Sequence, residues 1–232
     1  MPIEDKAIEE AAKTARHYLD GILLAPLAEF GLLIRDTVSF WRFKNQVNMV
    51  GKAKKLLEAK GIDAKTIAGS VLPENVIPLI EAGSETSNPT LSDLFASLLA
   101  TAINPKTAAS VHPSFGKILN QLAPLDAQIL VRLKNEIDAI QLRVDEGSKI
   151  ENMSNKIPLY RQFQYDAQKL SLSIDRSFEE VNLCFENLRR LGICDRGGGQ
   201  GGFLSQANQE PVIVFTDFGM RFLKACMENL AG

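Results

Sequence analysis

The chain has 232 residues, 45% hydrophobic and 23% charged, which excludes a disordered chain and allows one or two domains with a buried core. A formal net charge of −2 excludes a general attraction to nucleic acid or anionic lipid. Three cysteines without C-x-x-C spacing favour reduced thiols in a cytoplasmic protein over a disulfide framework or a zinc site.

The N-terminal residues predict helices. Helix formers fill Glu4 to Leu19, and the acidic stretch Met1–Lys13 lacks the basic start of a signal peptide. Gly21–Ile34 is the most apolar stretch, but its longest charge-free run covers only Gly21–Ala28. A membrane span needs about 20 apolar residues. We therefore expect a core helix here and no membrane span.

A long helix is predicted from Pro26 to Lys60, with Gly61 as its stop. Large apolar residues recur at spacings of three and four, which places them on one helical face. They are Leu27, Phe30, Ile34, Val38 and Trp41.

Two further helices follow. Pro73 predicts a helix near Pro73–Ala82, which the internal Pro78 should kink or shorten. Asn88-Pro89 predicts the start of a helix over Pro89–Ile103, whose apolar stripe is broad enough to indicate burial on more than one side.

A polar loop over Asn104–Pro113 predicts the boundary between an N-terminal helical domain, residues 1–110, and a C-terminal domain, residues 111–232. Pro113 and Pro124 predict the starts of two more helices. The polar and aperiodic segment Glu146–Pro158 predicts a loop.

The last sixty residues are the most informative. A helix over Phe178–Leu191 is predicted to begin with a capping box at Ser177 and Glu180 and to stop at Gly192. Its expected apolar face consists of Phe178, Val181, Leu183, Cys184, Phe185, Leu188 and Leu191.

A glycine-rich segment, Arg196–Gly202, and a β run, Val212–Phe215, follow this helix, and Thr216-Asp217 then opens a final helix. Helix, ribbon and helix in this order resemble a winged helix. The predicted fold is therefore mainly α, with an N-terminal helical bundle followed by a C-terminal winged-helix-like α+β module.

The sequence offers little chemistry. Gly197-x-Gly199-x-x-Gly202 matches the letters of a dinucleotide fingerprint, but it follows a helix and leads into extended residues, so a wing tip is predicted instead. His17 and His112 have no orienting partner near them in sequence. No D-x-D or E-x-x-H spacing recruits a metal. We expect no cofactor, no metal and no small-molecule ligand, and a role without catalysis.

Basic residues gather between Arg35 and Lys60, where Phe40, Trp41 and Phe43 lie among them. One interpretation is a phosphate-tracking surface with aromatics for stacking. The other is a structural helix whose aromatics are core and whose charges are solvated or pair with the acidic segment Asp63–Asp93. The candidate contact residues for nucleic acid or a partner are Arg42, Lys44, Lys52, Lys54 and Lys55 here, and Arg189, Arg190 and Arg196 in the C-terminal module.

The C-terminal module is not basic. From Glu151 to the end it has nine Lys or Arg and ten Asp or Glu. Its three close arginines predict a salt slope of about −2.7 for duplex binding, against about −10 for a dedicated repressor. This charge balance favours a module that docks protein.

Two stretches resemble the middle signature of the bacterial abortive infection alpha proteins: Leu79–Ala82 and Leu91–Ala100. Phe95 departs from that pattern, since the resemblance leads us to expect tryptophan there. The similarity extends from about Ala25 to Cys226, with further matches at Phe40–Asn45, His112–Phe115, Leu122–Leu130, Leu188–Ile193 and Phe215–Gly219.

The resemblance implies a place in bacterial defence against phage and carries over no catalytic residue. We therefore expect a non-enzymatic, cytoplasmic protein of an abortive infection system that acts through protein–protein contacts, with a protein partner or as a homo-oligomer. The alternative is a nucleic-acid-binding regulator that uses the winged helix or the basic helix over residues 35–60.

Overall fold

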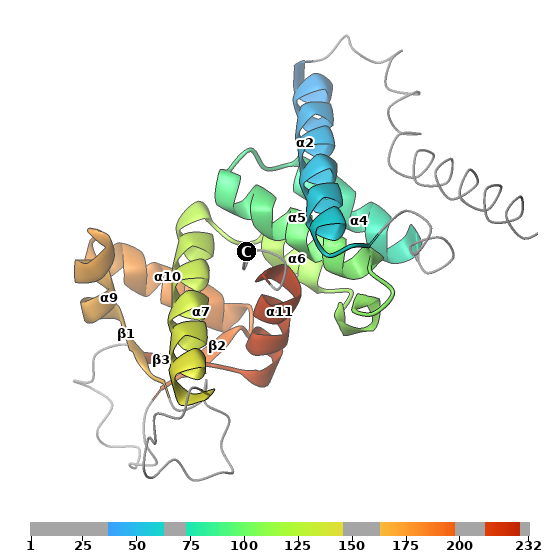
Figure 1. Cartoon of the computed structure of the whole chain (residues 1–232). Coiled ribbons are helices and arrows are strands. Elements are labelled where there is room, and N and C mark those ends of the chain that lie inside the picture. The colour runs from blue at the N-terminus through green and yellow to red at the C-terminus, as the bar shows by residue number, and fades with distance from the viewer. Residues whose placement is uncertain (1–36, 63–72, 146–162, 198–211, 228–232) are drawn as a thin grey trace, which may run out of the picture. The chain divides into compact units, whose positions relative to one another are not determined.

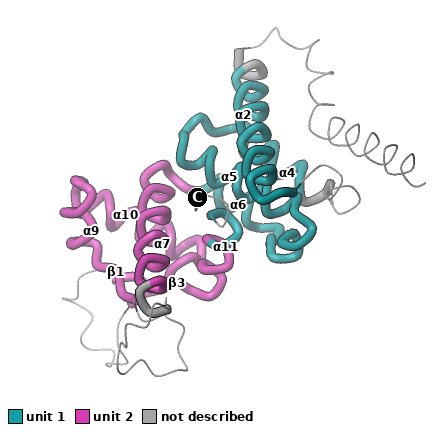
Figure 2. Tube along the Cα trace, viewed as in Figure 1, with its two compact units in different colours: residues 1–121, 224–232 teal, residues 122–223 magenta. Residues whose placement is uncertain are grey.

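The computed structural model describes residues 37–62, 73–145, 163–197 and 212–227 (Figure 1). The helices predicted before residue 37, the loop predicted at Glu146–Pro158 and most of the glycine-rich segment lie outside these residues. The chain forms two compact units (Figure 2): unit 1 contains residues 1–121 and 224–232, and unit 2 contains residues 122–223. The sequence places a division at 110/111, and the compact units divide at 121/122.

Unit 1 is helical where it is described, and α5 is its buried centre. α2 and α4 pack against α5 and against each other, and α6 packs against α4 and α5. The elements are α2 (Thr37–Ala59), α4 (Pro73–Ser84), α5 (Pro89–Ile103), the 3-10 helix η1 (Ala108–Ser110) and α6 (Phe115–Asn120). Most of α5 is buried around its whole circumference, as its broad apolar stripe predicts.

The ends of α2 and α5 follow the predicted signals. The Asn88 side chain accepts a hydrogen bond from the Leu91 N–H at 3.1 Å and caps α5. Gly61 ends α2 at φ 68°, donating to the Glu58 carbonyl, while the Ile62 N–H donates to the Leu57 carbonyl. This pair of bonds is the Schellman motif, which glycine permits because it has no Cβ.

Two boundaries in unit 1 differ from the prediction. α4 continues through Pro78 to Ser84. Pro78 has no N–H to donate to the carbonyl four residues earlier in the helix. Because Pro78 faces solvent, water can donate in its place. The helix predicted at Pro113 begins instead at Phe115, since a turn precedes it in which the His112 carbonyl accepts the Phe115 N–H at 3.0 Å.

A buried hydroxyl links α5 to the last turn of α11 (Asp217–Met227), and both of these segments belong to unit 1. Thr101 Oγ1 lies 2.8 Å from the Ala225 carbonyl and 2.9 Å from the Ser97 carbonyl. Buried polar groups need such partners because desolvation without a hydrogen bond is unfavourable.

Unit 2 combines helices with a small antiparallel sheet. Its elements are α7 (Pro124–Asp145), β1 (Tyr165–Asp166), α9 (Ala167–Ile174), α10 (Phe178–Arg190), β2 (Cys194–Arg196), β3 (Val212–Phe215) and the first part of α11. The strand order is β1-β3-β2, with Tyr165 opposite Ile213 and Cys194 opposite Phe215. Ile213 and Phe215 are buried, and Val212 and Val214, which alternate with them, are less so, as the two-residue period of a strand requires.

The helix ends of unit 2 also match the prediction. The Ser177 hydroxyl accepts the Glu180 N–H, and the Glu180 carboxylate accepts the Ser177 N–H, which completes the capping box. Gly192, at φ 72°, ends α10 in a second Schellman motif. Thr216 Oγ1 accepts the Gly219 N–H at 2.8 Å and caps α11.

The predicted class, mainly α with a small α+β module toward the C-terminus, is confirmed. Among the described helices, none combines the length and the apolar character that crossing a membrane requires.

Replacing Gly192 tests the left-handed end of α10. A Cβ at φ 72° strains the backbone, so Gly192→Ala should lower the free energy of unfolding by about 1–2 kcal/mol in a urea titration. Gly192→Asn is the matched control and should lose less, because asparagine tolerates this conformation better. An alanine variant as stable as the wild type would contradict the assignment.

Candidate functional site

Two of the candidate basic residues on α2 are paired with acids inside unit 1. Arg42 Nη2 lies 3.3 Å from Glu85 Oε1, and Lys52 Nζ lies 2.7 Å from Asp93 Oδ1. Both acids follow α2 in the chain, at the end of α4 and in α5. The ion pairs that the structural interpretation of this helix expects are therefore present, and they leave these two residues less available to a phosphate.

The other basic residues of α2 face solvent. Lys54 lies 3.8 Å from Glu58 on the helix surface, where both side chains are mostly exposed. Lys44 and Lys55 are exposed and have no ion-pair partner among the described residues. Among the described residues, these two lysines are the candidate basic residues of α2 that no acid pairs with.

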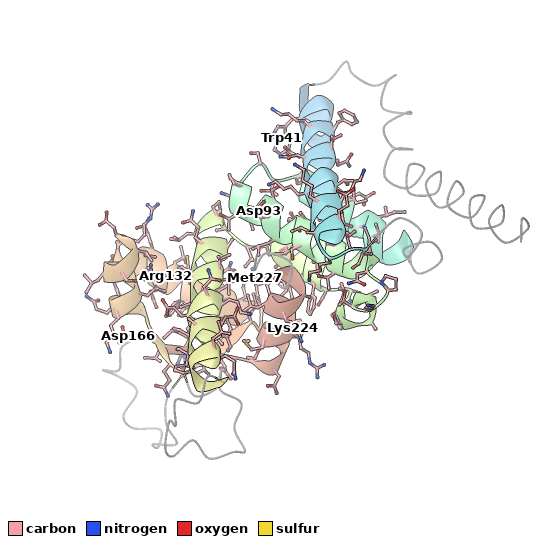
Figure 3. The ribbon with its side chains drawn as sticks, in the orientation of Figure 1. Trp41, Asp93, Arg132, Asp166, Lys224 and Met227 are labelled. Atoms are coloured by element: carbon pink, nitrogen blue, oxygen red, sulfur yellow. The ribbon has the colours of Figure 1, made fainter. Side chains whose placement is uncertain are left out.

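The aromatics of α2 divide between the two interpretations. Trp41, near the start of the helix (Figure 3), is 37% exposed. It is therefore not the core residue that the structural interpretation expects. Phe43 is partly buried. The side chain of Phe40 lies outside the description. Trp41 is therefore an exposed apolar side chain, one helical turn before the exposed Lys44.

The arginines of the C-terminal module are held by neighbours on their own helix. Arg189 Nη1 lies 3.6 Å from Glu186, and Arg190 donates twice to Asn187 Oδ1, at 3.1 and 2.9 Å. Arg196 is exposed on β2. Two of the three predicted phosphate contacts are therefore already engaged.

α10 has two distinct faces. Its buried face consists of Val181, Cys184, Phe185 and Leu188. The opposite face is exposed and is called the acidic stripe here; it consists of Glu179, Leu183, Glu186 and Arg190. At 3.6 residues per turn, these four positions lie along one side of the helix.

Leu183 corrects the sequence analysis. It was expected on the apolar face of this helix, yet its side chain is 71% exposed. Leu183 lies about 140° around the helix axis from the buried Leu188, so helical geometry turns it to solvent. The angle of a position on the helix decides which face it occupies, and apolar character alone does not.

A buried carboxylate attaches α10 to α7. Asp126 is 1% exposed, and its Oδ2 accepts the Ala123 N–H at 2.8 Å and the Asn187 side-chain amide at 2.6 Å. The first bond caps α7, and the second reaches α10 across 61 positions of sequence. This network had no signal in the sequence, because only the fold brings Asp126 and Asn187 together.

The three thiols are buried, and none of them forms a disulfide. Burial raises the pKa of Cys184, and the hydrogen bond to Asp126 raises it further. Burial also raises the pKa of Cys194, with a smaller effect from Asp195, and the pKa of Cys226. Because the thiolate is the reactive form, these groups are held in the form that reacts least.

His112 has the structural role expected before a helix. Its Nδ1 lies 2.8 Å from Ser114 Oγ and accepts the Ser114 N–H at 3.2 Å, and its ring lies against Phe115. His17 lies outside the description. Within residues 37–62, 73–145, 163–197 and 212–227, no three His, Cys, Asp or Glu side chains converge as a metal ion would require.

The glycine fingerprint lies in a β context. The Gly197 N–H donates to the Val212 carbonyl at 2.8 Å, next to the β2–β3 pairing. Gly199 and Gly202 lie outside the description. Gly197 therefore continues a ribbon, as predicted, whereas the dinucleotide motif requires a strand that leads into a helix N-terminus.

These features define a helix-rich protein with a small three-stranded sheet and an exposed, partly acidic helix in unit 2. The family model for abortive infection alpha matches residues 44–226, and the chain belongs to that family. The match begins later than the expected Ala25 and ends at the expected Cys226. No curated protein and no solved structure matches the chain. The family implies a role associated with abortive infection.

Thiol labelling tests the burial of the cysteines. At pH 8 a thiol reagent should react slowly with Cys184, Cys194 and Cys226 in the folded protein, because burial keeps them as thiols. All three should react quickly in urea, which serves as the control. A cysteine labelled equally fast in both states would contradict its described position.

The capping box gives a prediction about pH. The backbone N–H and the hydroxyl of Ser177 lower the pKa of Glu180, in that order of size. A depressed folded-state pKa contributes stability above the unfolded pKa, and this is lost as pH falls through the folded pKa. Ser177→Ala removes the hydroxyl, so the NMR titration of Glu180 should move part of the way back toward its usual pKa. An unchanged titration would contradict the role of the hydroxyl.

Proposed function

We propose that this protein acts in bacterial defence against phage as a non-enzymatic, cytoplasmic component that binds another protein through α10. The role associated with abortive infection comes from the family. The observation that supports protein binding is the outward face of α10, where an exposed leucine lies between two glutamates.

The order of elements in unit 2 supports a winged-helix-like module. α7, β1, α9, α10, β2 and β3 follow one another, with β3 between the other two strands of the sheet. Only residues 175–177 join α9 to α10, and Asp175 adopts φ 53° in that turn. A tight turn of this length is typical of a helix-turn-helix pair, whose second helix reads the partner surface.

The charges on α10 favour a protein partner over a nucleic-acid duplex. In a helix-turn-helix protein, the N-terminal residues of the second helix approach the base edges. Here those residues are Glu179 and Glu180, whose carboxylates would repel phosphates. The arginines lie at the other end of the helix, where Glu186 and Asn187 already hold them.

Leu183 is the expected anchor of the contact. Burying a leucine side chain contributes about 1.5–3 kcal/mol, whereas an exposed ion pair contributes about 0–1 kcal/mol. The glutamates on either side would then set the specificity of the contact by selecting a basic partner surface.

A role without catalysis is supported by what the reactive groups of the described residues do. The cysteines are buried with raised pKa values, His112 caps a turn, and Asp126 caps α7 while holding Asn187. Each of these groups contributes to folding.

Site-specific photo-crosslinking tests the proposal. A crosslinking amino acid at position 183 in phage-infected cells should give an adduct that protease removes and nuclease leaves intact. The same amino acid at Gln128, which is exposed on α7, is the matched control and should give no adduct. A nuclease-sensitive adduct at position 183 would favour the nucleic-acid alternative, and no adduct would contradict the proposal.

Phage protection gives the functional readout. If α10 binds the partner, Leu183→Asp should return plaque formation to the level of cells without the protein, because the charge prevents burial of this position. Leu172→Asp on α9 is the control, since Leu172 is 78% exposed and lies outside the acidic stripe. Circular dichroism must show both variants folded. Full protection by folded Leu183→Asp would count against this use of α10.

A further inference from the structure

Gly51 has no structural reason to be glycine within the described residues. It lies inside α2, where glycine is unfavourable because the unfolded chain gains freedom. A Cβ built on Gly51 would meet no described atom within 4 Å, apart from its own helix backbone and chain neighbours. Alanine would fit there and would favour the helix.

The other helical glycines of the described residues differ in this respect. A Cβ on Gly83 would collide with Met49, one on Gly116 with Leu79, and one on Gly219 with the Ile193 carbonyl. In each case the missing side chain allows two elements to approach closely. The close approach that would explain Gly51 must therefore come from something outside the described residues.

Gly51 lies in a row of outward positions on α2, called the basic stripe here: Lys44, Asn48, Gly51 and Lys55. Their spacing of four, three and four residues keeps them on one side of the helix over about 16 Å. The buried residues Met49, Ala53 and Leu57 occupy the opposite side. At Gly51 the stripe has no side chain, a feature called the notch here. One lysine lies on either side of it along the helix, Lys44 before it and Lys55 after it.

The acidic stripe of α10 has the same spacing of four, three and four residues. Its exposed leucine is a protrusion, and its two glutamates with Arg190 give it a net negative charge, opposite in sign to that of the basic stripe. One chain therefore presents both a notch with positive charges and a protrusion with negative charges.

We infer that a second copy of this chain binds the basic stripe through its acidic stripe, with Leu183 of the second copy seated on Gly51. The inference rests on the proposed use of α10 as a protein-binding helix and names the partner. The pairing joins two different surfaces, so copies associate head to tail or reciprocally.

When all four positions of each stripe are paired, the protrusion meets the notch only if the two helices run antiparallel. Leu183 then lies opposite Gly51, and Glu179 lies opposite Lys55. Glu186 lies opposite Asn48, one helical turn from Lys44. A parallel alignment would instead set Leu183 against the Asn48 amide, which leaves the leucine without an apolar notch.

One pair in this alignment is unfavourable. Arg190 lies opposite Lys44, and the two charges have the same sign. Arg190→Glu should therefore tighten self-association, by up to about fivefold for an exposed pair. This result is unexpected for a nucleic-acid contact, which the same change would weaken.

Gly51→Ala separates folding from association. The helix gains from alanine, so the thermal midpoint of the monomer should rise by about 2–4 °C. The added methyl group blocks the seat of Leu183, so the dissociation constant for self-association should rise at least tenfold. Fluorescence of Trp41, the single tryptophan, three residues before Lys44, offers a second readout of association.

Charge exchange between the stripes is the decisive experiment. Sedimentation velocity of the full chain should show association that depends on concentration. Lys55→Glu should weaken it, because position 55 then repels Glu179, and Glu179→Lys should weaken it because position 179 then repels Lys55. An equimolar mixture of these two variants should associate again, because the glutamate introduced at position 55 then meets the lysine introduced at position 179.

The outcomes separate this inference from the proposed function. A wild-type chain that stays monomeric at every concentration, or a mixture that does not regain association, would overturn the inference. Crosslinking of a different protein to position 183 would still support the proposed function in that case. Association that none of these variants changes would also overturn the pairing of the stripes.

Discussion

The rotation of α10 about its own axis determines what unit 2 presents to solvent. Burial of Val181, Phe185 and Leu188 fixes one face of the helix, and the hydrogen bond from Asn187 to the buried Asp126 fixes the same rotation independently. A shift of one residue would turn every side chain by about 100°. The exposed leucine and the glutamates around it are therefore a consequence of how the opposite face packs.

That arrangement has a cost. An exposed leucine gains nothing from the fold, and a glycine inside α2 is less favourable than alanine by about 1 kcal/mol. Stability alone would select neither residue at these positions. Both become favourable when a second surface covers them, because burial of the leucine and close approach at the glycine then contribute to association. The proposed contact between surfaces would account for both residues.

Sequence reasoning predicted the elements whose signals are local. Asn88, Gly61, Ser177 and Gly192 end or begin helices through bonds to residues a few positions away, so their roles follow from the sequence. The strand at Tyr165 escaped prediction because two residues carry no periodic signal, and it exists only through pairing with β3. The predicted end of α4 and the predicted start of α6 were wrong for other reasons: Pro78 is exposed to solvent in α4, and a local turn at His112 precedes α6.

The candidate contact residues remain a prediction, and their surroundings depend on contacts that the sequence does not show. The basic residues of α2 were identified, but their division between paired and exposed members depends on Glu85 and Asp93, which the fold brings close. Leu183 was assigned to the core because it is apolar. Its angle of about 140° from Leu188 on the helix, which follows from helical periodicity alone, places it on the opposite face.

Hydroxyl-radical footprinting in infected cells tests the contact role of α10 most directly. Leu183 and Leu172 are similarly exposed, at 71% and 78%. The oxidation of Leu172 therefore serves as the reference for the oxidation of Leu183. The account predicts that oxidation of Leu183 falls well below that of Leu172 when the protein is at work, because a protein surface covers α10. Equal oxidation of the two leucines, in cells where the protein protects against phage, would contradict it.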